Sequence, residues 1–394
     1  MNVISFNNFS ESFTKPFRNA LIALRNLFYP FVPVGHLKVW VLAPALNNPD
    51  PNLAYYYDFS QSIEEYTQVF KNLDLPWKWQ PVTLDNYESI LQEIANERQT
   101  GKFFPVVLNL CDGDETNGAP GVSIIGALNK KQFIYTGADE YFYDITTSKI
   151  PMKRAFDDAL IPTPKWEAIT DAKIIPEKLF EKLGTPIIVK PAVSGGSLGV
   201  GVKNVVETET ELSTQVAKMF EGYRGWDLAS QGIVAESFID GSEYTIMIVG
   251  SHTQPEFAKI YPPVERVFHA SLPAKEKFLS FDRLWEIYEE ESPMPKEENF
   301  YEYAVGSDAM QMSIQKVAWD AYVAVGGTGY TRVDVRVDKN TGTPYVLEVN
   351  AQCGISEDEN FTSIGAILRY ANQSFTELIV HIINDAFARR RKIN

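Results

Sequence analysis

Residues 331–350 carry the pattern that most restricts how this chain can fold. They read TRVDVRVD, KNTGT and PYVLEVN in succession. Alternate side chains of a strand point to opposite faces, so each outer segment has two distinct faces. The five residues from 339 to 343 suit a hairpin loop between them. The faces that we predict to be polar carry Arg332, Asp334 and Arg336 in the first strand, and Val346, Glu348 and Asn350 in the second.

The polar face of this hairpin sets two acids against each other. If pairing is symmetric about Thr341, Asp334 faces Glu348 and Arg332 faces Asn350. Facing residues lie about 4.5–5.5 Å apart at Cβ, where like charges destabilise the pair. A divalent cation held by these oxygen ligands explains the pattern, and such ligands suit Mg²⁺ shared with phosphates. The alternatives are a protonated carboxyl pair and a solvated face that arginines neutralise.

Composition excludes several classes of partner. The chain has 394 residues, and its hydrophobic content of 45% suits two or three globular domains. A net charge of −15 argues against nucleic acid as a partner. No apolar run of 18 residues predicts a transmembrane segment. The two cysteines form neither a disulfide framework nor a zinc motif. These features favour a cytoplasmic protein.

The first 36 residues look like an extension of the main body. Residues 13–35 are apolar and basic, and we interpret residues 1–36 as an N-terminal extension that contains a helix packed on the body. Interfacial membrane contact and an organelle address remain alternatives. No small-residue cleavage site follows, which argues against a secretory signal.

Hydrophobic periodicity divides the rest into three regions. Strand and helix patterns alternate over 37–145, which predicts an open α/β layer. Residues 146–243 begin with a helix pattern and continue with strands separated by glycine turns, including one at VGVKNV, which predicts a smaller α+β domain. Residues 244–394 form the third region, with a helix near 308–325. Within it, the polar stretch 286–300 predicts a mobile loop or surface insertion.

A glycine-rich loop follows the strand that ends at Lys190. The segment reads VKPAVSGGSLGVGV. Glycines let backbone N–H groups crowd around phosphate oxygens, and serine hydroxyls add donors. It is neither a Walker A loop nor a dinucleotide fingerprint, because no Gly-Lys-Ser/Thr and no helix follow it. An ordinary glycine hairpin is the alternative, but the lysine directly before the loop favours phosphate binding.

Three blocks together resemble the ATP-grasp fold, and within it the D-alanine–D-alanine ligase branch. They are VKPAVSGGSLGVGV, AESFIDGSEYT and GYTRVDVRVD…YVLEVNAQCGIS, and the resemblance covers about residues 37–390. It implies a three-domain fold of α/β and α+β type, with nucleotide held between the central and C-terminal domains. It also implies an enzyme that uses ATP and Mg²⁺, with Mn²⁺ as a substitute, to join a carboxylate to an amine through an acyl phosphate.

The resemblance also implies residue roles. Nucleotide contacts fall to Lys149, Lys190 and Ser197 at the phosphates, Glu236 and the backbone of Ser237, Phe238 and Ile239 at adenine, and Glu243 at ribose. The reaction centre comprises Asp334, Glu348 and Asn350 as metal ligands, Arg332 beside the transferring phosphate and Gly354 as a backbone donor to the oxyanion. The stretch 262–300 is the expected lid, with Lys277 or Arg283 as its cation.

The departures from the family pattern fall on the substrate side. Where the family has a glutamate that binds the first ammonium group, Tyr56 stands near the expected place and Asp58 is the nearest acid. The first serine of the usual loop pair is Gly196, and the usual histidine near Cys111 is absent. About three extra residues precede Thr362, which matches the family serine only roughly.

We therefore expect a ligase for small-molecule carboxylate and amine substrates other than D-alanine. A true D-alanine–D-alanine ligase is the first alternative. A kinase-like or carboxylase-like ATP-grasp enzyme and a non-catalytic nucleotide-binding regulator are the others. A homodimer remains open as the assembly.

Overall fold

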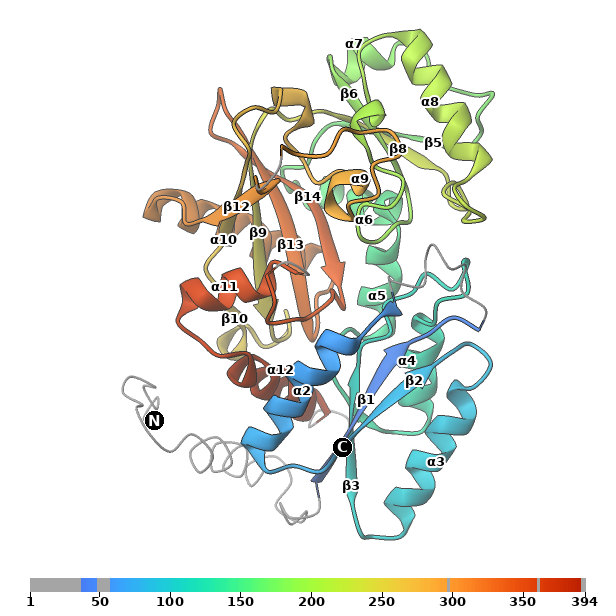
Figure 1. The fold of residues 1–394 in the computed structure, drawn as a ribbon, viewed down its shortest axis with the longest axis vertical. Coiled ribbons are helices and arrows are strands. Elements are labelled where there is room, and N and C mark those ends of the chain that lie inside the picture. The colour runs from blue at the N-terminus through green and yellow to red at the C-terminus, as the bar shows by residue number, and fades with distance from the viewer. Residues whose placement is uncertain (1–36, 48–56, 296–297, 360–361, 391–394) are drawn as a thin grey trace.

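The structure is a computed structural model that describes residues 37–47, 57–295, 298–359 and 362–390 (Figure 1). The described chain contains three sheets. Among these residues no helix is long and apolar enough to cross a membrane. The predicted extension 1–36 lies outside the described residues.

The N-terminal domain is an all-parallel sheet in the order β2-β1-β3-β4. Alternate residues of β1 enter two different cores. Val39 and Val41 pack with α2 and the C-terminal α12, whereas Trp40 and Leu42 pack with α3 and α4. The elements are β1 (Leu37–Pro44), α2 (Ser60–Leu73), β2 (Trp77–Val82), α3 (Tyr87–Gln99), β3 (Phe104–Asn109), α4 (Val122–Lys130), β4 (Ile134–Tyr135) and α5 (Glu140–Thr147).

The central domain is an antiparallel sheet in the order β5-β8-β6-β7. Its core joins the sheet to α7 and α8. The elements are α6 (Lys149–Asp158), β5 (Trp166–Ile169), α7 (Leu179–Leu183), β6 (Ile187–Pro191), η3 (Val202–Asn204), β7 (Val205–Val206), α8 (Glu209–Glu221) and β8 (Ile233–Ser237).

One predicted strand of this domain is wrong. We expected a strand at VGVKNV, but residues 202–204 form a 3₁₀ turn and β7 keeps only two residues. The Asn204 amide explains the turn, because it donates to the Val189 and Gly199 carbonyls while its oxygen accepts from the Gly201 N–H. A side chain that captures local backbone in this way competes with strand pairing.

The C-terminal sheet has the order β12-β11-β9-β13-β14, with β10 paired to β9. The boundary placed after residue 243 falls inside β9, so this sheet begins at Gly241. The elements are β9 (Gly241–Val249), η4 (Pro255–Phe257), β10 (Lys259–Ile260), β11 (Val264–Phe268), η5 (Ala274–Glu276), α9 (Phe281–Leu284), β12 (Tyr301–Ala304), α10 (Asp308–Ala324), β13 (Tyr330–Asp338), β14 (Pro344–Ala351), α11 (Ile364–Ala371) and α12 (Phe375–Arg390).

The predicted hairpin is β13–β14, and its register is confirmed where the acids lie. Asp334 pairs with Glu348, and Arg332 pairs with Asn350. A β-bulge after Asp334 pairs Val335 with Val346 and breaks the symmetry. Val346, which we had predicted to lie on the polar face, is therefore buried in the core. A bulge adds one residue to one strand and so reverses the alternation beyond it.

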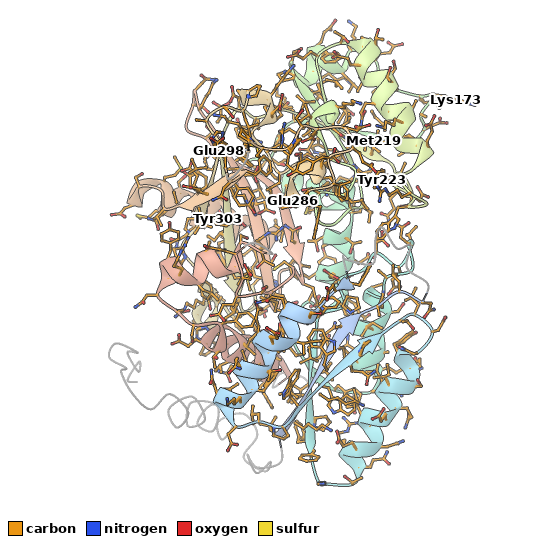
Figure 2. All side chains as sticks on the ribbon, in the orientation of Figure 1. Lys173, Met219, Tyr223, Glu286, Glu298 and Tyr303 are labelled. Carbon is orange, nitrogen blue, oxygen red and sulfur yellow. The ribbon has the colours of Figure 1, made fainter. Side chains whose placement is uncertain are left out.

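The expected lid, 262–300, is more ordered than the predicted loop. It contains β11 and α9, and residues 286–291 do not form a free insertion. Glu289 forms an ion pair with Arg224 and accepts from the Tyr223 hydroxyl at 2.9 Å, while Glu290 forms ion pairs with Lys203 and Lys218. Figure 2 labels Tyr223 and Glu286 in this region. We call residues 281–291 the clamp segment.

A partly buried histidine on α12 couples the fold to pH. His381 contacts the Tyr261 hydroxyl at 3.1 Å, with Lys259 and Glu377 nearby. Burial, and to a lesser extent Lys259, lowers the pKa of His381 to about 4. The unfolded chain therefore binds a proton near pH 6.5 that the folded chain refuses, and stability present above pH 6.5 is lost as the pH falls toward 4.

We expect His381→Gln to flatten this dependence. Over that range of pH, the titration of His381 changes the free energy of unfolding by about 3 kcal/mol at most. Denaturant unfolding of both proteins at pH 7 and pH 5 measures it, since other titrating groups cancel in the comparison. Equal losses of unfolding free energy in the two proteins would contradict the assignment.

Candidate active site

A cavity of about 220 Å³ lies between the central and C-terminal sheets. Its walls come from α6, β6, the glycine loop, β8, β9, β11, β13 and β14, together with the clamp segment. Most of the predicted site residues line it: Lys149, Lys190, Ser197, Glu236, Ser237, Phe238, Ile239, Glu243, Arg332, Asp334, Glu348, Asn350 and Thr362. Asp58 and Gly354 do not.

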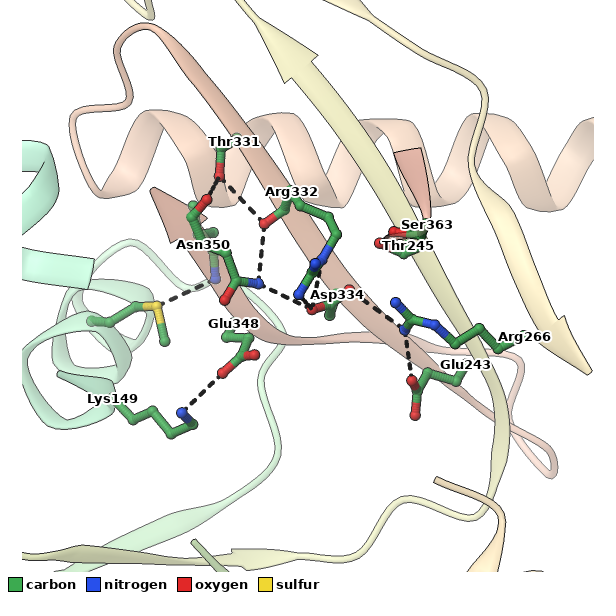
Figure 3. Close-up of polar contacts among 12 residues, drawn as sticks. Lys149, Glu243, Thr245, Arg266, Thr331, Arg332, Asp334, Glu348, Asn350 and Ser363 are labelled. Atoms are coloured by element: carbon green, nitrogen blue, oxygen red, sulfur yellow. Dashed lines mark hydrogen bonds and ion pairs between the residues drawn. The ribbon is translucent and has the colours of Figure 1, made fainter. Parts of the chain in front are cut away.

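The acidic corner of the cavity is built by the hairpin (Figure 3). Asp334 Oδ2 accepts from the Arg332 guanidinium at 3.2 and 3.3 Å and from the Asn350 amide at 3.0 Å. Glu348 forms an ion pair with Lys149 at 3.0 Å. Burial raises the pKa of Asp334, but Arg332 and Arg266 outweigh it and hold the pKa below its usual range.

These residues fit a divalent cation. Asp334 Oδ1 is buried and accepts no hydrogen bond from the described residues, while Arg266 Nη1 lies 3.7 Å away. The described residues contain no group of three or more His, Cys, Asp or Glu side chains suited to a metal. A cation here would therefore share Asp334, Glu348 and Asn350 with phosphate oxygens, as Mg²⁺ commonly does.

A second charged cluster lies where α6 meets β6 and β8. Glu236 is fully buried, and its two oxygens lie 3.3 Å from Lys153 Nζ and 3.2 Å from Lys190 Nζ. Burial raises the pKa of Glu236, but the lysines outweigh it and hold the pKa below its usual range. Lys153 was not predicted. Its spacing of four residues from Lys149 on one helix was the available signal.

At the third cluster, Glu243 lies between two buried arginines. Arg266 Nη1 donates to it at 2.8 Å, and Arg336 Nη1 lies 3.7 Å away. Burial lowers the pKa of Arg266, yet Tyr303, Asp334 and Glu243 together raise it. Arg266 was not predicted, although its strand offered a signal. Arg266 alternates with the buried Val264 and Phe268, so a cation occupies the apolar face of β11.

The hinge, residues 237–239 after β8, already uses part of its backbone in hydrogen bonds within the protein. The Ser237 N–H donates to the Lys165 carbonyl, and the Phe238 N–H donates to the Pro186 carbonyl. The Ser237 hydroxyl donates to the Leu183 carbonyl at 2.6 Å. A base at this edge would therefore meet backbone carbonyls and the Ile239 amide, with the Phe238 ring beside it.

The glycine loop is held open at the cavity and fastened to the clamp segment. Gly199 has φ +75°, and a Cβ there would lie 2.8 Å from Pro191, so only glycine fits. Trp285 Nε1 donates to the Gly196 carbonyl at 2.8 Å. Leu284, Trp285 and Phe278 line the cavity, and none of them was predicted.

The expected lid cations do not reach the cavity. Lys277 does not line it, although its carbonyl accepts from Arg336. Arg283 is buried and contacts Glu276 at 2.7 Å and Glu291 at 3.5 Å. Among the described residues of the lid segment, the cation that lines the cavity is Arg266.

On the substrate side, Asp58 is exposed and accepts from the Ser60 N–H and hydroxyl at the start of α2. The structure therefore places Asp58 in the turn that precedes α2 and does not bring it to the cavity. Tyr56 lies outside the described residues. Gly354 is exposed, and a Cβ there would meet the Thr362 methyl at 3.8 Å. Thr362 and the unpredicted Ser363 line the cavity.

A buried acid of the N-terminal domain holds the loop between Gly354 and Thr362. Glu65 on α2 accepts from the Ser356 hydroxyl at 2.7 Å, the Glu357 N–H at 3.1 Å and the Asp358 N–H at 3.2 Å. Thr362 in turn donates from its N–H to the Asp358 carbonyl at 3.1 Å. The inserted loop is thus positioned from another domain.

Comparison with known proteins identifies the family of the chain. A family model described as D-ala D-ala ligase C-terminus matches residues 156–384, which is more than half of the chain. The chain belongs to the D-alanine–D-alanine ligase family. Membership of this family makes the chain an ATP-dependent ligase that forms C–N bonds.

Relatives within the D-alanine–D-alanine ligase family are distant. The D-alanine–D-alanine ligase of Idiomarina loihiensis is 26% identical over 276 residues, covering 69% of this chain and 78% of the relative. That of Nitrosococcus oceani is 28% identical over 278 residues, covering 69% and 75%.

Solved structures share the fold. A Bacillus anthracis D-alanine–D-alanine ligase complexed with ATP has a TM-score of 0.62 and 19% identity, and the match covers 91% of this chain and all of that one. The D-alanine–D-alanine ligase from Coxiella burnetii has a TM-score of 0.61 and 18% identity, covering 91% and 97%. These likenesses confirm the ATP-grasp architecture of the D-alanine–D-alanine ligase family.

Proposed function

We propose that this protein is an ATP- and Mg²⁺-dependent carboxylate–amine ligase that acts on a substrate pair other than two D-alanines. The observation that carries the proposal is that one cavity joins two lysines beside a glycine loop to the Asp334–Glu348–Asn350 corner. The lysines and the glycine loop suit phosphate groups, and the acidic corner suits a cation bound to those phosphates. Such an arrangement supports transfer of a phosphoryl group.

The clusters of the cavity suggest how ATP lies in it. Glu236 and the hinge would receive adenine, and Glu243 would accept from the ribose hydroxyls. Lys149, Lys190 and Ser197 would contact the phosphates beside the acidic corner. Lys190 is bound to Glu236 in the structure, and its side chain lines the cavity, so it has a short path to a phosphate oxygen.

The residues at the acidic corner would then support two steps. A substrate carboxylate oxygen attacks the γ-phosphorus, ADP leaves and an acyl phosphate forms. The amine attacks the acyl carbon, loses a proton, and inorganic phosphate leaves as the amide forms. Arg332 would neutralise charge on the transferring group. The clamp segment would exclude water, which otherwise hydrolyses the acyl phosphate.

Asp334, Glu348 and Asn350 would hold Mg²⁺, for which Mn²⁺ can substitute. When bound, the ion neutralises phosphate charge and fixes the orientation of the phosphate chain. In the structure Lys149 forms an ion pair with Glu348, and Arg332 forms one with Asp334. The same cations are therefore close enough to contact phosphate oxygens beside the ion.

The positions at which the family binds its substrates carry different residues in this chain, which supports a different substrate. The glutamate expected to bind an ammonium group is replaced, Asp58 is occupied with α2, and the inserted loop before Thr362 is held by Glu65. A site built from buried polar groups discriminates by several orders of magnitude, since a wrong partner leaves them unpaired. The second candidate is a true D-alanine–D-alanine ligase, which the names of the relatives at 26% and 28% identity favour.

We expect D-alanine alone to elicit little phosphate release. The assay supplies ATP, Mg²⁺ and D-alanine, and mass spectrometry looks for the dipeptide. A screen over amino acids and cell metabolites should find a carboxylate and amine pair that releases much more phosphate. Efficient formation of D-alanyl-D-alanine would establish the second candidate instead. A phosphorylated carboxylate or alcohol formed without need of an amine would indicate a kinase-like reaction.

A further inference from the structure

One buried carboxylate in the cavity has two cations. Glu236 lies between Lys153 and Lys190, and each Nζ is within 3.3 Å of a carboxylate oxygen. The lysines differ in position. The Lys190 side chain lines the cavity and is 13% exposed, whereas the Lys153 side chain is fully buried and does not line it. Only Lys190 can therefore reach a ligand without leaving its place in the core.

The fold fixes Lys153 from behind. Its Nζ donates to the Thr163 hydroxyl at 2.8 Å, and that hydroxyl donates to the Val346 carbonyl at 2.8 Å. Val346 also donates its N–H to the Pro162 carbonyl at 2.8 Å. The ammonium group of Lys153 is thus tied to β14, the strand that carries Glu348.

We propose that Lys153 is a positioning residue for base selection, which holds Glu236 ionised and oriented while Lys190 contacts phosphate. This inference rests on the proposed binding of ATP. A buried carboxylate that lost Lys190 and had no second cation would take up a proton, because burial disfavours its charged form. Lys153 supplies the permanent partner.

The charge state of Glu236 decides which base it accepts. An ionised carboxylate only accepts hydrogen bonds, so it pairs with the 6-amino group of adenine. A protonated carboxyl can also donate, and it then pairs with the 6-oxo group of hypoxanthine. Lys153 therefore favours a 6-amino purine over a 6-oxo purine although it touches neither.

The test compares the binding of ATP and inosine 5′-triphosphate by titration calorimetry in the presence of Mg²⁺. Loss of one charge-assisted contact corresponds to roughly a tenfold to hundredfold change in binding. We expect Lys153→Met to reduce the preference for ATP by that factor. Thr163→Val, which removes only the second partner of Lys153, should reduce it less. Lys182→Met, which removes the exposed ion pair with Glu167, serves as the matched control.

A double-mutant comparison separates positioning from a general loss of structure. In a Glu236→Gln background, Lys153→Met should cause no further loss of preference, because its effect passes through the carboxylate. Unchanged preference in Lys153→Met, or an equal further loss in the Glu236→Gln background, overturns the inference. If Lys153→Met does not fold, Thr163→Val decides, and wild-type preference in that variant overturns the inference. Failure of wild-type protein to bind either nucleotide overturns the proposed function instead.

Discussion

Glu348→Gln is expected to lower turnover by roughly a thousandfold while leaving the protein folded. The substitution keeps the size of the side chain but removes a charge from the pair of facing acids on the hairpin. With that charge gone, Asp334 and Asn350 alone hold a phosphate-bound cation poorly, and the transferring phosphate loses compensation for its charge. The Glu348 side chain is 27% exposed, so the amide remains partly hydrated and the fold tolerates it.

The measurement is phosphate release with the substrate pair found in the screen, together with thermal unfolding. Glu167→Gln is the matched control, since it neutralises an exposed acid of the same type paired with Lys182. Turnover of Glu348→Gln within tenfold of wild type would remove Glu348 from the reaction centre. Loss of turnover in the control as well would point to net charge and not to the corner.

Lys190→Ala is expected to weaken ATP binding by about 1.5–3 kcal/mol, which is the worth of a charge-assisted contact to a buried phosphate. Glu236 keeps Lys153 as its partner, so the variant is expected to fold. Titration calorimetry with ATP and Mg²⁺ measures the effect. Lys203→Ala is the control, because Lys203 is exposed, follows the same glycine loop and pairs with Glu290. Equal ATP affinity in Lys190→Ala and wild type would exclude Lys190 as a phosphate contact.

The hairpin shows why part of the site could be predicted from the sequence. Apolar and polar residues alternate along both strands, so the pairing that buries the apolar face sets Val333 opposite Val349. The same register pairs Asp334 with Glu348. The bulge was not predictable in the same way. With or without the bulge, β14 offers an apolar side chain to the core at this point. That side chain is Leu347 in the regular register and Val346 in the bulged one, so the amino-acid pattern does not distinguish the two registers.

Contacts between distant segments account for most of what the sequence did not predict. Glu65 lies in an amphipathic helix, where an acidic side chain is ordinarily predicted to face solvent. In the structure it accepts from three donors nearly 300 residues away in the sequence. Arg266 stands between apolar residues of its strand, but only the pairing of β11 with β9 brings it to Glu243. Such partners become visible only when the strands are in place.

The clamp segment has a consequence for the timing of a reaction cycle. It contacts the glycine loop through Trp285, α8 through Glu290 and the turn after α8 through Glu289. Exposed ion pairs of this kind are individually weak and are screened by salt. A clamp fastened by such pairs would open more often at higher ionic strength, so the rate at which nucleotide leaves the cavity is expected to rise with salt.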